Sequence, residues 1–373
     1  MRTRTPLLTT SLACLALASL ASLASLASLA CHVTIDREQG TIPLSFTVKM
    51  HEPPGTAEAP LEYSTAPRTF TLDVEAVEFS GEKATWFNGD VYLDVAPRGR
   101  LAKGQTRTIT LVDGKALGVS VEVQRVHGES SIWVEDRGTD EKPGSYATGL
   151  SPTIHVGHPT LHDVSETTNI AGSALSGDFV QVNTKGRRLV ATGLAVDGFY
   201  LTDLDDPTQS YNAIFAHTHS RPRGVEQGDF ITEIIGTVEE FYGFTELGFP
   251  TYKVGGHLDE IPTFVLTPEV VADDQAMEKL ESRLVEVRDV TVCELGEGYS
   301  SFGQWIVLLD PAGDCTSGKG GVTVVSALSA TKFTPAPLVG KVLPRITGDL
   351  RYHVAARPSW IMYTRSDDDI EIE

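Results

Sequence analysis

Short alternating runs of β-branched and aromatic residues, interrupted at close intervals by glycine and aspartate, constrain the fold of this chain more than any other feature. After residue 68 these runs occupy residues 69–74, 91–95, 107–111, 119–126 and 131–134. Glycine or aspartate separates them, at Gly89-Asp90, Gly99, Asp113-Gly114 and Gly128. Period-two alternation over such lengths is typical of strands that bury one face. The pattern predicts an antiparallel β fold.

The first block of strands, residues 68–137, has the strand spacing of a small β-sandwich. We expect an immunoglobulin-like fold class here, with Trp133 in the core, although the paired cysteines of true immunoglobulin domains are absent from this segment. Residues 138–159 contain Asp, Glu, Lys, Pro and Gly and are predicted to be a linker.

The chain begins with a targeting segment. Arg2 and Arg4 precede an uncharged stretch, mainly Leu, Ala and Ser, that runs from residue 7 to residue 30. This pattern is typical of a secretory signal. The string Ser28-Leu29-Ala30-Cys31 resembles the lipobox of bacterial lipoproteins, with Ser28 where that motif usually has Leu. The resemblance implies that Cys31 is acylated once residues 1–30 are removed. An ordinary cleaved signal and a retained membrane helix are the alternatives.

The lipoprotein resemblance also implies a location. In that family a residue other than Asp after the acylated Cys, here His32, indicates the outer membrane. The expected location is therefore the bacterial cell envelope, with the protein anchored by lipid and facing the periplasm or the cell surface. Residues 31–67 are rich in Pro, Glu and Thr and are predicted to be a stalk or linker.

The cysteine count agrees with export. Of the four cysteines, Cys14 lies in the signal and Cys31 is the lipid acceptor, so Cys293 and Cys315 remain as an even pair in an oxidising compartment. A disulfide between them would close a loop of about twenty residues and contribute roughly 3 kcal/mol. A metal pair is the alternative, but no nearby His or Cys completes a zinc site.

The most informative block follows the linker. It contains Gly177-Asp178-Phe179-Val180, then residues 190–193, 198–203, 228–231 and 240–247. In order and spacing, the segment from Thr160 to Phe264 resembles the OB-fold domains that accompany catalytic domains in secreted bacterial nucleases. Ser165 and Ala174 depart from the Gln and Pro that this family prefers. The resemblance implies a five-stranded OB-like barrel over residues 160–266.

A weaker copy of this block occupies residues 267–373. The eight-residue step from Gly228 to Gly236 recurs from Gly340 to Gly348. This second unit is predicted to begin with a short helix over residues 268–280. The expected fold class is therefore mainly β, with an immunoglobulin-like sandwich followed by two OB-like barrels.

Catalytic motifs are missing from the sequence. The nucleases of the resemblance carry a large α/β catalytic domain, and the chain after Phe264 is too short for one. No P-loop, dinucleotide fingerprint, His-Glu-x-x-His or Gly-x-Ser-x-Gly motif is present. We therefore expect neither an enzyme nor a cofactor, with a divergent metal-dependent hydrolase as the minor alternative.

Candidate ligand-binding residues lie on the outer face of the first barrel. OB-folds bind ligands on strands 2 and 3, and residues next to an inward-facing Phe199 or Leu201 point outward. The candidates are Tyr200, Thr202, Phe215, His217, His219, Arg221 and Arg223. Aromatic rings beside Arg stack on bases or sugars. The favoured interpretation is that this face packs against the neighbouring barrel or the sandwich, and ligand binding here is the alternative.

Two groups are weak metal candidates. His217 and His219 share one strand face, but a third ligand is not evident. Asp203, Asp205 and Asp206 are closely spaced carboxylates that suit Ca²⁺, but the pattern of a helix-loop-helix calcium site is absent. A surface His pair and a solvated acidic turn are the favoured interpretations, and we expect no metal.

Charge separates the remaining function hypotheses. The formal net charge is −20, and removing residues 1–30 takes away two Arg and no acid, which leaves −22. Proteins that hold nucleic acid by neutralising phosphates usually carry a clustered basic surface. The favoured hypothesis is a lipid-anchored, non-catalytic binding or scaffolding protein with a protein or polysaccharide partner. Binding of nucleic acid or polysaccharide through Tyr200, Phe215, Arg221 and Arg223 is the alternative.

Overall fold

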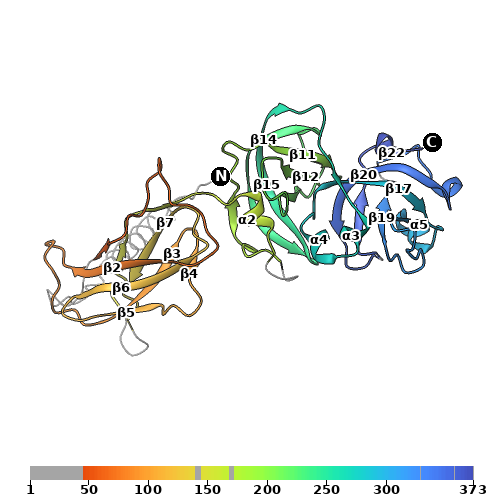
Figure 1. Ribbon diagram of the computed structural model, residues 1–373. Helices are drawn as coiled ribbons and strands as arrows, with labels where there is room; N and C mark the ends of the chain where they lie inside the picture. The colour runs from red at the N-terminus through yellow and green to blue at the C-terminus, as the bar shows by residue number, and fades with distance from the viewer. Residues whose placement is uncertain (1–44, 139–143, 168–171, 328, 357, 373) are drawn as a thin grey trace, which may run out of the picture.

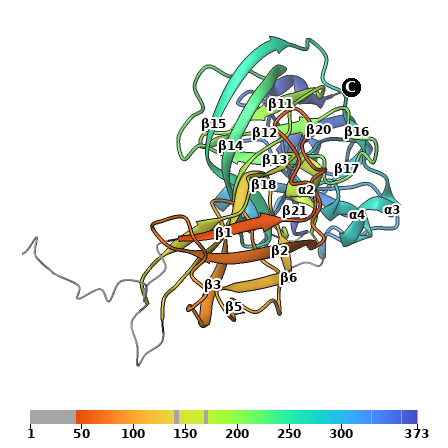
Figure 2. The ribbon, with the colours of Figure 1, turned by 90° about the vertical axis from the view of Figure 1, so that its left-hand side faces the viewer.

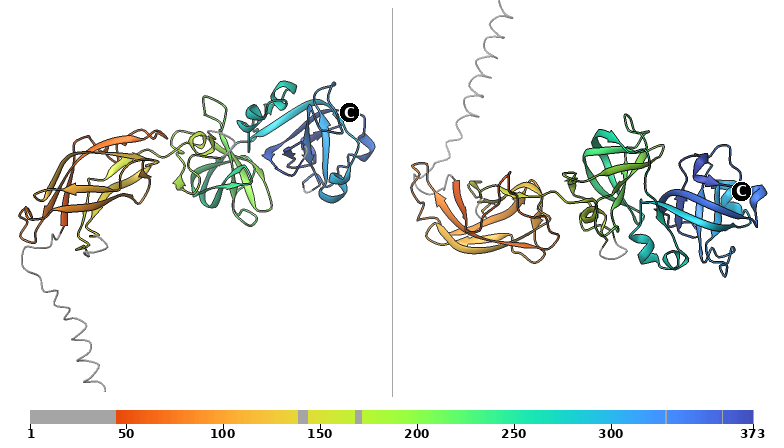
Figure 3. Two further views of the ribbon diagram at one scale, coloured as in Figure 1. Left: turned by 90° about the horizontal axis from the view of Figure 1, so that it is seen from below. Right: turned by 45° about the horizontal axis from the view of Figure 1, so that its top comes forward.

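The computed structural model describes residues 45–138, 144–167, 172–327, 329–356 and 358–372. Strands make up 46% of the chain and helices 8%, so the protein is mainly β, as predicted. An N-terminal unit of two sheets and two closed five-stranded barrels follow one another along the molecule (Figures 1 and 3). The predicted signal, residues 1–30, and the predicted lipid acceptor Cys31 lie outside the described residues.

The N-terminal unit consists of two antiparallel sheets. The first contains, in spatial order, β1 (Ser45–Met50), β2 (Arg68–Val77), β6 (Lys115–Gln124) and β4 (Arg100–Leu101). The second contains β5 (Thr108–Leu111), β3 (Gly89–Ala96), β7 (Gly128–Glu135) and β8 (Thr148–Leu150), and β9 (Ile154–Val156) also pairs with β7. The five predicted strands therefore correspond to β2, β3, β5, β6 and β7.

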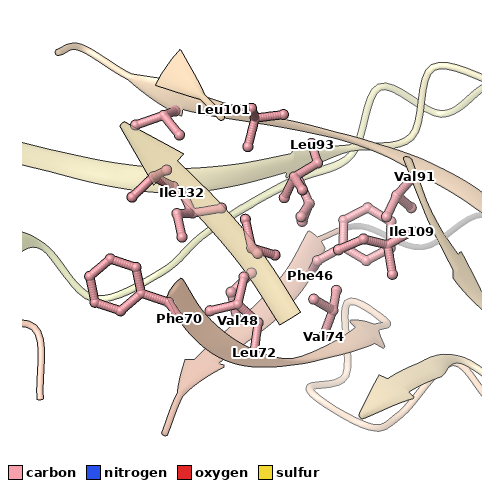
Figure 4. Packing of buried hydrophobic residues seen from close by; sticks show 14 of the residues in the cluster. Phe46, Val48, Phe70, Leu72, Val74, Val91, Leu93, Leu101, Ile109 and Ile132 are labelled. Atoms are coloured by element: carbon pink, nitrogen blue, oxygen red, sulfur yellow. The ribbon is translucent and has the colours of Figure 1, made fainter. Parts of the chain in front are cut away.

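Side chains from both sheets share one core in this unit (Figure 4). Phe70 and Leu72 come from β2, and Leu93 and Ile132 come from β3 and β7. Along each of these strands buried residues alternate with more exposed ones. Because the side-chain period of a strand is two, this alternation fixes which face of each sheet lies inside.

The unit extends beyond the boundaries expected from sequence. Strand β1 lies within residues 31–67, the predicted stalk, and pairs with β2 (Figure 2). Strands β8 and β9 lie within residues 138–159, the predicted linker, and pair with β7. Phe46 is buried in the shared core. Because these strands are short and lie beside Pro- or Gly-rich sequence, composition alone assigned them to connections.

Trp133 does not occupy the core, which corrects the expectation from sequence. Its neighbours Ile132 and Val134 are fully buried, so alternation along β7 places the indole on the opposite face. There it packs edge-on against the ring of Tyr92 with centroids 5.9 Å apart. The guanidinium of Arg137 also lies over the Tyr92 ring, 3.5 Å from its centroid. The large aromatic residue therefore belongs to an outer stack.

The first barrel closes through five strands. They are β11 (Leu189–Leu194), β12 (Gly198–Asp203), β13 (Ala213–His217), β15 (Phe244–His257) and β14 (Asp229–Phe241), in this order around the ring. β13 and β15 run parallel, while the other neighbours in the ring are antiparallel. The short strand β10 (Phe179–Gln181) adds to β14. Helix α2 (Leu161–Ser165) has a capping box of Thr160 and Asp163, and Leu161 and Val164 lie in the barrel core.

The second barrel repeats this arrangement. Its ring contains β17 (Leu284–Val292), β18 (Gln304–Leu308), β19 (Gly321–Val325), β21 (Trp360–Tyr363) and β20 (Val342–Tyr352). Here β19 and β21 run parallel, as β13 and β15 do in the first barrel. Short strands β16 (Phe264–Val265) and β22 (Ile370–Glu371) extend the sheet. Helix α5 (Glu297–Phe302) and the 3-10 helices η1 (Ala336–Leu338) and η2 (Asp367–Asp369) lie in its connections.

Two details of this barrel bear on the sequence predictions. The single helix expected over residues 268–280 is two helices, α3 (Pro268–Val271) and α4 (Asp274–Glu278). The break occurs because the Asp273 side chain accepts hydrogen bonds from the backbone amides of Gln275 and Ala276, which caps a new helix. The predicted disulfide is present and joins Cys293, just after β17, to Cys315 between β18 and β19.

Candidate functional site

The outer face of β12 and β13 packs against the second barrel. Tyr200 and Phe215 are buried, with ring centroids 4.9 Å apart, and they cluster with Phe244 of β15. Arg351 of β20 lies over this cluster, with its guanidinium carbon 4.2 Å from the centroid of Phe244 and 5.6 Å from that of Phe215. A cation over aromatic faces is attractive, and more so when desolvated. The second barrel therefore occupies the surface from which the sequence predicted ligand binding.

A second contact between the barrels is polar. The Thr192 hydroxyl on β11 donates to Oδ1 of Asp349 on β20 at 2.8 Å. Nη1 of Arg365 donates to the carbonyl of Thr192 at 3.1 Å, and Nη2 donates to Asp369 at 2.6 Å. Burial raises the pKa of Asp349 to about 7, although Arg365 and the Thr192 hydrogen bond act in the opposite direction.

A third contact lies where the chain enters the second barrel. Arg283 donates to the backbone carbonyl of Gln209 at 2.5 Å and to its side-chain oxygen at 2.8 Å. The carboxylate of Glu281 accepts from the backbone amide of Thr245 at 3.0 Å. Burial raises the pKa of Glu281 well above its usual value, and the nearby carboxylate of Glu278 raises it further. Together the three contacts span barrel one from β11 to β15.

The residues predicted to bind a ligand therefore differ in their exposure to solvent. Tyr200, Thr202 and Phe215 are buried. Arg221 and Arg223 lie exposed in the connection after β13. Alternation along the strands indicated which residues point outward from the barrel and left packing against a neighbouring domain as one interpretation, and the structure shows that the second barrel covers three of them.

The histidine pair is held by its own neighbours. Nδ1 of His217 lies 2.9 Å from a carboxylate oxygen of Glu246. The rings of His217 and His219 lie with centroids 3.9 Å apart, and His219 stacks on Phe249 at 4.0 Å. The imidazoles thus pack on one another instead of converging on a common point.

The three candidate aspartates each have a different role. Asp203 is buried and pairs with Arg187, while Asp205 pairs with Arg188 at 2.6 Å. Asp206 accepts hydrogen bonds from backbone amides of its own loop. Within the described parts of the chain, no group of three or more His, Cys, Asp or Glu side chains is arranged to hold a metal ion.

A hollow of about 380 Å³ lies beside the aromatic contact between the barrels. One wall is the turn of the β14–β15 hairpin, and the opposite wall is the end of β20 with part of β21. The lining residues are Phe241, Tyr242, Arg351, Tyr352, His353, Val354 and Tyr363. We call this hollow the junction groove. Its size is within the range of small-molecule sites, which occur preferentially between domains.

Two aromatic side chains stand at the mouth of the junction groove. Phe241 is 53% exposed and Tyr242 is 74% exposed, and their rings meet edge-on with centroids 4.9 Å apart. Tyr242 has a φ of 54° and is followed by Gly243 with a φ of 85°. A two-residue hairpin turn of this kind favours Asn-Gly, and a bulky residue at positive φ is strained. The turn therefore holds an exposed tyrosine at a conformational cost.

The floor of the junction groove carries a cation. Arg351 forms no ion pair within the part of the chain that the structure describes, and its buried Nε has no hydrogen-bond partner there. Burial raises the pKa of Tyr363, while Arg351 opposes that effect. Aromatic walls, a positive charge and phenol groups can together hold the faces and the polar edges of a ring-shaped ligand.

The sequence contained a signal for this groove that composition did not reveal. The string Phe241-Tyr242-Gly243-Phe244 lies within residues 240–247 of the OB-like block. An aromatic residue immediately before the glycine of a predicted two-residue turn is the unusual feature. It could have marked the turn as a binding loop, but the opposite wall comes from residues more than a hundred positions later.

Comparison with family models and with curated proteins finds no match to this sequence. In the described ranges of the chain, the helices are too short or too polar to cross a bilayer.

Proposed function

We propose that this chain is an exported, lipid-anchored binding protein that holds its ligand in the junction groove. The observation that carries the proposal is the pair of exposed aromatic rings, Phe241 and Tyr242, at a cavity that Arg351 also lines. Exposed apolar groups at a concave site are a general mark of recognition surfaces. The role is binding or scaffolding, without catalysis.

The ligand class that fits best is an oligosaccharide. The apolar faces of sugar rings pack on aromatic side chains, and sugar hydroxyls pair with Arg, His and Tyr groups such as those of the junction groove. Nucleic acid would also stack on aromatic rings, but the net charge of −20 repels a long polyanion. We therefore prefer a polysaccharide of the cell envelope as the ligand.

The barrel topology supports this choice. In both rings the first strand pairs with the second and the fourth, and the third runs parallel to the fifth. We infer that both barrels are OB-like and that the N-terminal unit is an immunoglobulin-like sandwich. OB-folds use the loop between their fourth and fifth strands for oligonucleotides and oligosaccharides. The Phe241-Tyr242 turn is that loop in barrel one.

Export and anchoring rest on the N-terminal sequence. The basic start, the uncharged stretch and the lipobox-like Ser28-Leu29-Ala30-Cys31 support acylation at Cys31 and an outer-membrane location. The disulfide between Cys293 and Cys315 supports an oxidising compartment.

Binding is tested by titrating the protein with neutral and uronic-acid oligosaccharides and with single-stranded DNA at low and high salt. Tyr242→Ala should weaken oligosaccharide binding at least tenfold. Phe79→Ala, which removes a 93% exposed ring from the N-terminal unit, is the control and should leave binding unchanged. Salt-sensitive binding of DNA but not of sugars would replace the polysaccharide proposal. No effect of Tyr242→Ala would remove the junction groove from it.

Anchoring is tested by membrane fractionation. Cys31→Ser should abolish acylation and release the protein, whereas Cys14→Ser should change neither. Retention of the Cys31→Ser protein in membranes would favour an uncleaved helix over residues 7–30.

A further inference from the structure

A second cavity lies between the N-terminal unit and barrel one. It measures about 390 Å³ and is lined by Pro97, Arg98, Gly99, His127, Gly177, Asp178 and Phe179. The first four come from connections of the N-terminal unit, and the last three come from the end of the loop before β10 and its first residue. Figure 3 shows these two units adjacent along the molecule. The cavity is therefore separate from the junction groove.

The charged residues that line this cavity are Arg98 and Asp178. Asp178 is paired with both Arg100 and Arg125, the latter with Nη1 and Oδ2 3.5 Å apart. Arg98 forms no ion pair with any described residue, and the Ser130 hydroxyl contacts only its backbone carbonyl. Two guanidinium groups thus share the carboxylate of Asp178, while that of Arg98 has no carboxylate partner among the described residues, in a chain whose net charge is −20. Arg98 is partly buried, and a charge that is withdrawn from water normally has a partner of opposite charge.

Two histidines complete the surroundings. His127 lines the cavity with only 1% of its surface exposed, and its Nδ1 has no hydrogen-bond partner among the described residues. Nδ1 of His158 is buried and likewise lacks a partner there. Buried polar atoms of this kind normally have a protein or solvent partner. Each imidazole therefore retains a hydrogen-bonding position for a ligand or water.

The backbone at Gly128 leaves room for these groups to converge. A Cβ atom at Gly128 would lie 2.6 Å from Nη1 of Arg98 and 3.2 Å from Cε1 of His158. The φ of Gly128 is 63°, in the region that favours glycine. The guanidinium and the His158 ring thus meet over a position where any side chain would collide with them.

We propose that this cavity binds a phosphate group through Arg98 and His127, with His158 beside them. A planar guanidinium is the preferred partner of phosphate oxygens because it donates in a fixed fork. Arg100 and Arg125, although paired with Asp178, add to the positive potential. The phosphate belongs to a small solute or to a phospholipid headgroup.

Protonation of His127 provides a direct readout. Burial, together with the nearby positive charge of Arg98, lowers the pKa of His127 to about 4. Burial and Arg98 also lower the pKa of His158. An anion placed beside these imidazoles favours their charged forms and opposes both effects. Phosphate binding should therefore raise the pKa of His127.

The test is a histidine NMR titration of the full-length protein in detergent, with the His127 signal assigned from His127→Gln. Inorganic phosphate, at constant ionic strength set by chloride, should raise the pKa of His127 by one unit or more, a tenfold change in proton affinity. Arg98→Gln should abolish the rise. Arg107→Gln is the control, because it removes an Arg paired with Asp94 elsewhere on the N-terminal unit. It should leave the rise in the His127 pKa unchanged.

Vesicles separate the two sources of phosphate. Co-sedimentation of the Cys31→Ser protein with phosphatidylglycerol vesicles, lost in the Arg98→Gln background, would assign the site to a lipid headgroup. A response to inorganic phosphate without such binding would assign it to a small solute. Absence of any His127 shift with both probes in the otherwise unchanged protein would overturn the proposal, as would a shift that persists in Arg98→Gln.

Discussion

Tyr242 has a left-handed backbone conformation and lies at the proposed binding groove, so it bears on both stability and the proposed binding. Tyr242 precedes Gly243 in the two-residue turn of the β14–β15 hairpin, where Asn is the favoured residue. We predict that Tyr242→Asn raises the free energy of unfolding by about 1 kcal/mol, because Asn adopts positive φ more readily. The same change should weaken oligosaccharide binding, because it removes a ring from the mouth of the junction groove.

Urea unfolding and ligand titration of the same preparation check both effects. Tyr211→Asn is a useful comparison, since Tyr211 also has a positive φ, of 53°, but lies away from the junction groove. It should leave binding unchanged. A loss of stability in Tyr242→Asn would show that the ring contributes more by packing on Phe241 than it costs in backbone strain.

Asp349 gives the interface between the barrels a pH dependence with a defined sign. Its pKa rises from 3.8 to about 7 on folding because the carboxyl is buried. The folded state therefore binds a proton that the unfolded state has lost, so stability falls as pH rises from about 4 to 7. The effect is at most about 4 kcal/mol, from roughly 1.4 kcal/mol per unit of pKa.

We predict that Asp349→Asn reduces this decline and makes the protein more stable than the parent above pH 7. Thermal unfolding between pH 4 and pH 8 measures it. Asp205→Asn is the control, because the hydrogen bond from Arg188 lowers the pKa of Asp205. The contribution of Asp205 to stability is therefore lost as pH falls, which is the opposite direction to that of Asp349. Equal slopes in the parent and Asp349→Asn would contradict the role of this carboxyl. Glu240, Glu278 and Glu281, whose pKa values burial also raises, should maintain a residual slope of the same sign.

At the scale of elements, the disulfide joins the end of β17 to the connection between β18 and β19. Its cysteines are 22 positions apart, and closing a loop of that length contributes roughly 3 kcal/mol through the unfolded state. We predict that the paired change Cys293→Ser and Cys315→Ser lowers the free energy of unfolding by about this amount. Calorimetry with and without reductant measures it, and reductant should have no effect on the paired variant. A reductant-sensitive transition in that variant would contradict the assignment.

Strand existence was predictable at this scale, and strand limits were not. Runs such as residues 69–74 alternate clearly and became β2, because alternation reflects burial of one face. Strand β8 has only three residues, too few for alternation to mark a strand in the sequence, and it forms by pairing with β7. The prediction of a single helix over residues 268–280 was wrong for a local reason. Asp273 forms the N-cap of α4 instead of continuing α3.

At the scale of the whole molecule, the two barrels are joined by buried contacts around Arg351. We predict that Arg351→Ala separates their unfolding into two transitions, because it removes the cation that lies over Phe215 and Phe244. The expected loss is about 2 kcal/mol, typical of a desolvated cation–aromatic contact. Calorimetry and hydrogen exchange of β12 measure it. Arg345→Ala on the same strand removes a partly exposed pair with Glu371 and should leave the coupling intact. Unchanged cooperativity in Arg351→Ala would contradict this role.

The sequence by itself determined the mainly β class, two similar C-terminal units and the partners of the disulfide, while the count of five strands in each unit came from the OB-fold resemblance. These follow from period-two alternation, repeated motifs and cysteine count, which are local or one-dimensional. Only the tertiary structure decided that the outer face of barrel one, with Tyr200 and Phe215, is buried under Arg351. It also placed Tyr242 opposite His353 and Arg98 beside His158, because such neighbours are set by the packing of separate units against one another. An outward-facing residue looks the same in sequence whether water or another domain covers it.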